Sequence, residues 1–217
     1  MFYLIVIAAA NVLIVLCNAL ASRAGSLNEW LWYLLCSVAA TAFVFALDAL
    51  GAVLIRRLPE RWFAPGKRNF EVSERERRLW RKLGVKRWTP LVPEWGGFTD
   101  FHKDRLASST DTAYLARFLL ESNYGVVIHL ENALLGFLIL LLPLSRHPGV
   151  GVPVAAVNFV LSFLPVVILR YNTPPLLRLW RRSQAKEDEK EKNPPPSTPS
   201  APAAPPPADP ANLTPTR

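Results

Sequence analysis

Four long apolar runs, separated by polar segments of unequal length, dominate the 217-residue chain. The runs cover residues 1–21, 30–55, 124–144 and 151–170. At a rise of about 1.5 Å per residue, each run reaches roughly the 30 Å thickness of a bilayer's hydrocarbon core. Because only a helix satisfies its own backbone hydrogen bonds within lipid, all four runs are predicted to be transmembrane helices. The predicted fold class is therefore an all-α integral membrane protein.

The spacing of the runs predicts two membrane hairpins and two polar regions. Residues 1–55 form the first hairpin and residues 121–172 the second, joined by a long segment over residues 56–120. Residues 173–217 form a tail that is first basic and then proline-rich, with 10 of the chain's 20 prolines after residue 193. Such a composition cannot build a core, so the tail is predicted to be disordered from Ser183 onward.

The first run also has a feature of a secretory signal peptide. Ala19-Leu20-Ala21 resembles a signal-peptidase site. However, a signal peptide has a positively charged segment before its apolar stretch, and no Lys or Arg precedes the stretch here. We expect this run to be retained as a membrane helix, with cleavage as the alternative.

The basic residues predict how the chain is oriented. The net charge is +8, with 15 Lys or Arg from Arg56 to Arg117 and 8 more from Arg170 onward. Since cytoplasmic loops collect positive charge, the segment 56–120 and the C-terminus are predicted to be cytoplasmic in a multi-pass protein of the cell membrane. Anionic lipid accounts for these charges, so membrane lipids are the expected partners and nucleic acid is not.

The connecting segment is predicted to contain amphipathic helices. Ser73 and Glu76 have the spacing of a capping box, which opens a strongly basic helix over residues 74–83. Leu79, Trp80 and Leu83 fall on one side of it. Such a helix typically lies in the headgroup layer with its apolar side down, and a solvated charged helix is the alternative.

Two further features complete this segment. Residues 84–97 are rich in Gly and Pro and contain Trp88 and Trp95, a composition typical of a turn-rich loop at the membrane interface. Apolar residues recur at helical steps over residues 111–120. That helix is expected to continue directly into the third membrane helix.

Ionisable residues inside membrane helices are rare and are functional candidates. Asp48 in the second run and His129 and Glu131 in the third meet this description. Counted from the cytosolic ends of their helices, Asp48 and His129 lie at a similar depth of roughly 8–11 Å. They are therefore expected to meet within the bundle.

The third run carries a stripe of polar and small residues along one face. Steps of 4, 4, 3 and 4 join Glu121, Gly125, His129, Asn132 and Gly136. Small residues let another helix approach closely, while the polar residues supply a carboxylate, an imidazole and an amide. Glu131 points away from this face.

His129 has two interpretations. A neutral imidazole can act as general base on a hydroxyl near pH 7, with Glu121 orienting it or binding a sugar hydroxyl. Alternatively, His129 and Asn132 form hydrogen bonds to a neighbouring helix and hold the bundle together. The sequence has no Gly-x-Ser-x-Gly elbow and no Walker motif, and its three His are dispersed, so neither a metal site nor a cofactor is predicted.

Several segments resemble the glycosyl-4,4′-diaponeurosporenoate acyltransferase family. The family's blocks are similar, in order and spacing, to residues 79–88, Leu91-Val92-Pro93, residues 101–106, residues 114–122, His129 and Arg170-Tyr171-Asn172. The resemblance spans roughly half of the chain. Two positions depart from the family's pattern, since Val126 replaces a glutamate and Thr173 an arginine.

The resemblance implies an enzyme that esterifies a sugar hydroxyl of a glycosylated carotenoid, or a similar lipid glycoside, with a fatty acyl group. Its implied partners are that glycoside and a fatty acyl donor such as acyl-CoA. His129 and Glu121 are the candidate catalytic residues. The candidate substrate-binding residues are Lys86, Trp88, Asn132, Arg170, Tyr171, Asn172 and Asp48. The alternative function is a non-catalytic membrane scaffold that acts through its basic loop and proline-rich tail.

Overall fold

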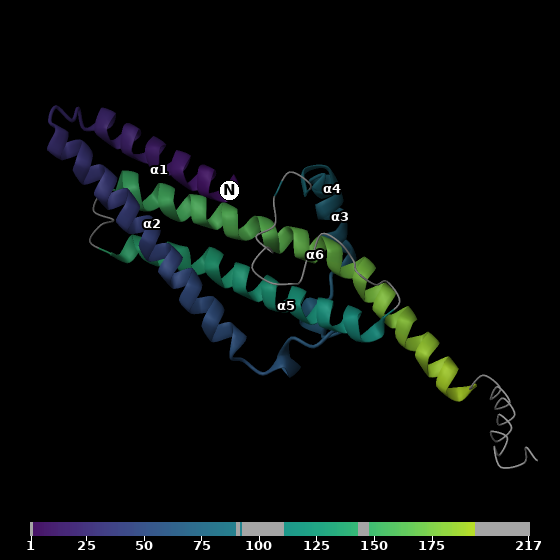
Figure 1. The fold of residues 1–217 in the computed structure, drawn as a ribbon. Helices are drawn as coiled ribbons and strands as arrows, with labels where there is room; N and C mark the ends of the chain where they lie inside the picture. The colour runs from purple at the N-terminus through teal and green to yellow at the C-terminus, as the bar shows by residue number, and fades with distance from the viewer. Residues whose placement is uncertain (1, 90–91, 93–110, 143–147, 194–217) are drawn as a thin grey trace, which may run out of the picture.

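The computed structural model describes residues 2–89, 92, 111–142 and 148–193. The predicted fold class is confirmed, because the described residues are helical without strands and include four helices long and apolar enough to cross a membrane. These helices are α1 (Phe2–Ala21), α2 (Leu27–Arg56), α5 (Thr112–Leu135) and α6 (Pro148–Lys192) (Figure 1). The predicted interfacial Trp95 and the proline-rich segment lie outside the described residues.

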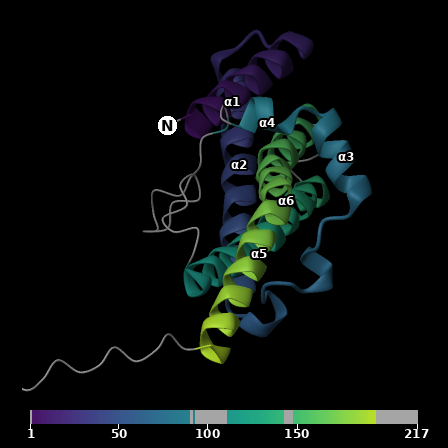
Figure 2. The ribbon, with the colours of Figure 1, turned by 90° about the vertical axis from the view of Figure 1, so that its right-hand side faces the viewer.

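The bundle is arranged around the pair formed by α5 and α6, which pack along one another (Figures 1 and 2). Helix α2 contacts both members of this pair, and α1 packs on α2 and α6. An apolar core joins them where Ile14 of α1, Cys36 and Val44 of α2 and Val150 and Val154 of α6 are buried together. Helix α1 is thus fixed to the outside of the bundle by two of the other three helices.

Polar capping residues define where the helices begin. Ser26 and Glu29 form a reciprocal capping box at the start of α2, and the Asp111 side chain accepts from the Tyr114 backbone N–H at the start of α5. Helix α5 then runs unbroken to Leu135, which confirms the prediction that the helix at residues 111–120 continues into the membrane helix. At Gly136 the chain tightens into the 3-10 helix η5 (Gly136–Leu141).

Helix α6 is longer than the sequence analysis predicted. It continues through the segment assigned to the tail and ends at Lys192, so the prediction of disorder is wrong for residues 183–192. Oppositely charged residues three and four positions apart, such as Asp188 and Lys192, support a helix there, and the lysines suit its C-terminal end. The composition of the segment therefore misled the prediction.

Prolines occur inside α6 without ending it. Each proline removes the N–H that would bond the carbonyl four residues earlier. At Pro153 the freed carbonyl is that of Gly149, and the Asn18 side-chain nitrogen of α1 donates to it at 2.7 Å. The proline thus creates an acceptor that helps to dock α1 on α6.

The described part of the segment between α2 and α5, residues 57–89 and Val92, packs on the bundle. It contains the short helices η1 (Glu60–Trp62) and η2 (Arg68–Phe70), followed by α3 (Glu74–Lys82) and α4 (Val85–Trp88). Figure 1 shows α3 and α4 beside the middle of α6.

Helix α3 begins where the sequence predicted, but its apolar side is only partly buried. The Ser73 side chain caps α3 by accepting from the Glu76 backbone N–H, as predicted. The expected apolar side is divided, because Trp80 is buried against the bundle whereas Leu79 and Leu83 are about half exposed.

Candidate active site in the membrane

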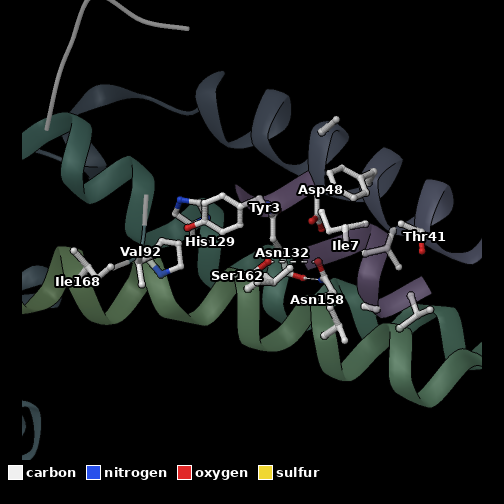
Figure 3. A pocket seen from close by; sticks show the side chains of 18 of the residues that line it. Tyr3, Ile7, Thr41, Asp48, Val92, His129, Asn132, Asn158, Ser162 and Ile168 are labelled. Atoms are coloured by element: carbon white, nitrogen blue, oxygen red, sulfur yellow. Dashed lines mark hydrogen bonds between the residues drawn. The ribbon is translucent and has the colours of Figure 1, made fainter. Parts of the chain in front are cut away.

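A cavity of about 940 Å³ lies between α1 and α5, with α2 and α6 as its side walls. We call it the membrane cavity. Most of its lining is apolar, and its size is at the upper end of what small-molecule sites usually have. Figure 3 shows the polar side chains that project among the apolar ones.

Four of the predicted site residues line the membrane cavity: Asp48 on α2 and Glu121, His129 and Asn132 on α5. Asp48 and His129 both line this cavity, and their direct contact stays a prediction. The other five predicted residues, Lys86, Trp88, Arg170, Tyr171 and Asn172, are absent from the cavity lining in the described part of the chain.

His129 projects into the cavity from the last third of α5 and is half-buried. In Figure 3 its imidazole lies at the same end of the cavity as Tyr3 of α1 and Val92, which follows α4. Glu121 stands eight residues earlier on α5, a rise of about 12 Å. Glu121 therefore lies nearer the N-terminal end of α5, beside the end of α2, and His129 lies about two turns further along the helix.

Asp48 lies beside a contact between α2 and α5. Gly51, one turn later on α2, is so close to Glu131 of α5 that a Cβ on the glycine would lie 2.1 Å from Glu131 Oε1. With its nitrogen turned toward its acceptors, the Asn132 amide donates to Glu131 Oε2 at 2.9 Å. Glu131 is thus held at the α2–α5 interface, and Asp48 Oδ1 is buried without a hydrogen-bond partner among the described residues.

Helix α6 adds a polar group opposite Asn132. The Asn158 side-chain nitrogen donates to the Asn132 carbonyl at 3.0 Å, and Asn158 lines the cavity with Ser162. The Asn158 side chain lies where α5 gives way to the 3-10 helix η5 at Gly136. A Cβ on Gly136 would lie 2.2 Å from the Asn158 amide nitrogen. Pro165 leaves the carbonyl of Leu161 without its helical N–H, and both residues line the cavity.

Helix α1 closes the opposite side of the cavity. Asn11 Oδ1 accepts from Ser37 Oγ at 2.6 Å and from Thr41 Oγ1 at 3.1 Å, both on α2. Asn11 and Thr41 line the cavity together with Tyr3. The wall that α1 contributes is thus held by hydrogen bonds as well as by apolar packing.

The polar end of the cavity carries two arginines. Arg56, at the end of α2, places Nη1 2.6 Å from Glu121 Oε2, and Arg117, in the second turn of α5, places Nη2 3.0 Å from Glu121 Oε1. All three residues line the cavity. The Glu121 side chain is 13% exposed, so it lies between two guanidinium groups that are themselves about half exposed.

The five remaining candidates are found outside the cavity. Arg170 on α6 donates to both carboxylate oxygens of Glu76 on α3, with Nη2 2.7 Å from Oε2. Trp88 and Tyr171 pack on an apolar cluster built from Trp80 and Val85 of the α3–α4 segment and Val167 of α6. We call this ion pair and cluster the α3–α6 clamp.

Lys86 and Asn172 belong to neither set of contacts. Lys86 is exposed on α4, and Asn172 is half-buried on α6. The candidate residues taken from the family resemblance thus include some that join the basic segment to α6 and others that line the cavity.

The environment of Glu76 shows that the ion pair of the clamp is favourable. Burial alone would raise the pKa of Glu76, but the hydrogen bond and positive charge of Arg170, with hydrogen bonds from Trp80 and Ser73, hold it below its ordinary value. The charged form of Glu76 is therefore favoured when α3 is packed on α6.

Sequence reasoning missed several residues of the cavity. Asn11 and Asn158 were missed because only ionisable groups in the membrane runs were considered as candidates. Amide side chains in lipid also need hydrogen-bond partners, so they could have been included. Arg56 and Arg117 were counted only as positive charges that report topology. Both arginines are directed toward the cavity by ion pairs with Glu121. The pair between Arg56 and Glu121 joins α2 to α5, and such a tertiary contact cannot be read from the sequence of one helix.

The fold and the cavity define a multi-pass membrane protein with an internal, mostly apolar site whose polar end carries basic groups. The sequence model described as glycosyl-4,4′-diaponeurosporenoate acyltransferase matches residues 59–182. The chain belongs to that acyltransferase family. No curated protein and no solved structure matches the chain.

The matched segment contains α3, α4 and α5 in full and α6 as far as Arg182, and it begins after the end of α2. His129, Glu121 and Arg117 lie inside the matched range, whereas Asp48 and Arg56 precede it. Helices α1 and α2 thus complete a cavity whose α5 and α6 walls belong to the family segment.

Proposed function

We propose that this protein is an integral-membrane acyltransferase that esterifies a sugar hydroxyl of a lipid-like glycoside, a glycosylated carotenoid of the diaponeurosporenoate type, with a fatty acyl group. The observation that carries the proposal is the position of His129, an imidazole in the wall of a membrane cavity within an acyltransferase family segment. The basic end of the bundle faces the cytoplasm, in keeping with the distribution of Lys and Arg.

The shape and chemistry of the cavity suit both substrates. Its apolar walls, which include Val154, Val157 and Leu161 of α6, can hold a polyene or an acyl chain away from water. Hydroxyl groups of a sugar need acceptors, which Asp48 of α2 and the freed Leu161 carbonyl of α6 offer on the two side walls. In this arrangement the sugar lies between Asp48 and the Leu161 carbonyl. The polyene or acyl chain lies along α1 and α6.

In the reaction, the imidazole of His129 accepts the proton of the attacking sugar hydroxyl. The hydroxyl oxygen forms a bond to the acyl carbonyl carbon, and the bond between that carbon and the donor's leaving group breaks. The leaving group then takes the proton from the imidazolium, which restores neutral His129. General base catalysis of this kind contributes about 10²–10⁴-fold to a rate.

The test is ester formation by membranes that contain the full chain. Membranes are incubated with a glycosylated diaponeurosporenoate and an isotope-labelled acyl donor, and extracted lipids are analysed by mass spectrometry. A product heavier than the acceptor by one acyl group is expected with the wild-type chain. His129→Ala should lose this product, whereas Leu130→Ala, a matched control at an exposed neighbouring position, should retain it.

Two results would contradict the proposal. One is unchanged ester formation by His129→Ala at equal amounts of folded protein. The other is the absence of any acylated glycoside with wild-type membranes, whichever acyl donor is supplied. In that case a non-catalytic role in binding lipids or partners would account for the same fold.

A further inference from the structure

We propose that Arg56 and Arg117 form an anion site at the mouth of the membrane cavity, and that this site holds the phosphate of the acyl donor. The inference rests on the proposed function and names the chemical class of the donor, a fatty acyl group carried by a phosphate-bearing molecule. A nucleotide thioester and a phospholipid both have this chemistry. The arms of the experiment below separate them.

The geometry of the two arginines brings positive charge to one place. They approach different oxygens of the same carboxylate, Arg56 at Glu121 Oε2 and Arg117 at Glu121 Oε1. Glu121 can neutralise one of the two charges. Among the described residues Arg117 also pairs with Glu60 at 4.0 Å, but that carboxylate is 70% exposed and such an ion pair contributes little.

Both guanidinium groups keep access to solvent and to the cavity. The Arg56 side chain is 47% exposed and that of Arg117 is 60% exposed, yet both line the cavity. A guanidinium group has five N–H donors in a planar fork, so the bond to Glu121 leaves donors for a second oxyanion. Arg56 and Arg117 can therefore bind a phosphate without losing the carboxylate that holds them.

The position of Arg56 is fixed by an aromatic support. Its guanidinium carbon lies 4.9 Å from the centre of the Tyr124 ring, a cation–π distance. The Tyr124 ring stacks on Phe63 with centroids 3.9 Å apart, and its hydroxyl donates to the Leu58 carbonyl at 3.0 Å. The arginine is therefore placed before a ligand arrives, which reduces the entropy lost on binding.

The anion site stands at a useful distance from His129. Glu121 and His129 are separated by about 12 Å along α5, which leaves room for the atoms that link a phosphate to an acyl carbonyl. A donor bound by its phosphate at the mouth would extend its acyl group toward His129 and its hydrocarbon chain into the apolar interior. After transfer, the phosphate-bearing leaving group departs from the cytosolic end with the proton it takes from His129.

The basic residues of α3 do not provide this arrangement. Its exposed arginines, such as Arg75 and Arg78, are absent from the cavity lining in the described part of the chain. They offer the same charge without a cavity for an acyl chain. This difference supplies a matched control, because two arginines can be neutralised at either place.

Binding to the full chain in uncharged maltoside micelles tests the proposal. The probes are S-hexadecyl-CoA, which has a thioether that cannot react, and a diether phosphatidylglycerol. The wild-type chain should bind at least one probe, and Arg56→Gln/Arg117→Gln should weaken that binding by at least about tenfold. Arg75→Gln/Arg78→Gln should leave the dissociation constant within about twofold, since distant exposed charges contribute little.

The two probes identify the source of the phosphate. Loss of S-hexadecyl-CoA binding in the cavity double variant assigns a nucleotide thioester, and loss of phosphatidylglycerol binding assigns a phospholipid. Wild-type binding should also weaken as salt is added, and more steeply than binding by the cavity double variant. Failure of the wild-type chain to bind either probe, or equal weakening by the two double variants, would overturn the proposal.

Kinetics separate the failure of this inference from failure of the proposed function. In the cavity double variant the KM for the donor should rise by about tenfold or more while kcat changes little. If ester formation proceeds with an unchanged KM in that variant, the anion site is wrong although the acyltransferase function stands. If arginine-dependent probe binding is found but no ester forms, the anion site stands and the proposed reaction is wrong.

Discussion

The membrane cavity and the α3–α6 clamp use the same kinds of residues in opposite ways. In the clamp, Arg170 and Glu76 are each about one-fifth exposed and satisfy one another. In the cavity, Arg56 and Arg117 share the carboxylate of Glu121 and remain about half exposed. A closed ion pair joins two parts of the chain, whereas an incompletely neutralised one can bind a further charge.

The same contrast holds for the uncharged residues. Trp80 and Val85 of the clamp are buried in direct apolar contact with Val167 of α6. The cavity instead leaves space between His129 and Asn158, and polar groups project into it (Figure 3). We therefore propose that the clamp contributes mainly stability and the cavity mainly chemistry, and variants of each should affect different measurements.

The largest expected effect is on turnover. Replacing His129 with Ala should lower the rate of ester formation by at least about a hundredfold, because a general base is removed. The thermal unfolding midpoint in detergent should change little, since His129 is only half-buried. If activity and unfolding midpoint fell together, His129 would belong with the clamp as a structural residue and the comparison would fail.

The sequence was sufficient to predict much of the membrane architecture. The apolar runs predicted four membrane helices, and the recurrence over residues 111–120 predicted the beginning of α5. These features depend on local composition and periodicity, which a single sequence contains. The helical extension of α6 to Lys192 was missed because charged, lysine-rich composition is shared by disordered tails and solvated helices.

The cavity was predicted less completely than the helices. The cost of ionisable groups in lipid identified Asp48 and His129, which line it, and Glu131, which lies at the contact of α2 with α5 instead. The polar stripe along α5 added Asn132, which also lines it. The same reasoning gave Glu121 a role beside His129, but its partners in the structure are Arg56 and Arg117. Such a pairing depends on the packing of α2 against α5, and periodicity within one helix cannot give it.

The clamp should respond to the loss of one charge. Glu76→Gln removes the negative partner of Arg170 and should lower the free energy of unfolding by about 2 kcal/mol, a typical value for a hydrogen bond to a charged group. The specific activity per folded molecule should be retained, because neither residue lines the cavity. Chemical denaturation and ester formation on the same preparations test both expectations.

The sign of the pH dependence follows from the lowered pKa of Glu76. Its contribution to stability is present above the ordinary glutamate pKa of about 4.3 and is lost as the pH falls through the lower folded value. Packing of α3 should therefore be unchanged from pH 5 to 8 and weaken below about pH 4. Hydrogen exchange of α3 measures this, and Glu76→Gln should remove this part of the acid response. An equal acid response in that variant would show that another group controls the packing.

A smaller effect is expected where α5 and α6 meet. In Gly136→Ala the new methyl carbon would lie 2.2 Å from the Asn158 amide nitrogen and 3.3 Å from its Cβ, so the whole side chain would have to move. Overpacking of this kind typically costs about 1–3 kcal/mol, and we expect the low end because the amide can turn into the cavity. Denaturation measures the cost, and a shift in acceptor KM would show that the displaced amide enters the substrate's space. Leu134→Ala, at an exposed position, is the control for a substitution on α5.

The smallest effect concerns how α1 is fixed as a wall of the cavity. Asn18→Ala removes the hydrogen bond to the Gly149 carbonyl and should destabilise by about 0.6 kcal/mol, the average for such bonds between membrane helices. Pro153→Ala restores an N–H that can bond that carbonyl within α6. The cost of Asn18→Ala should therefore shrink in the Pro153→Ala background, and a double-mutant cycle measures the difference. Strictly additive costs would show that the proline does not prepare the acceptor for Asn18.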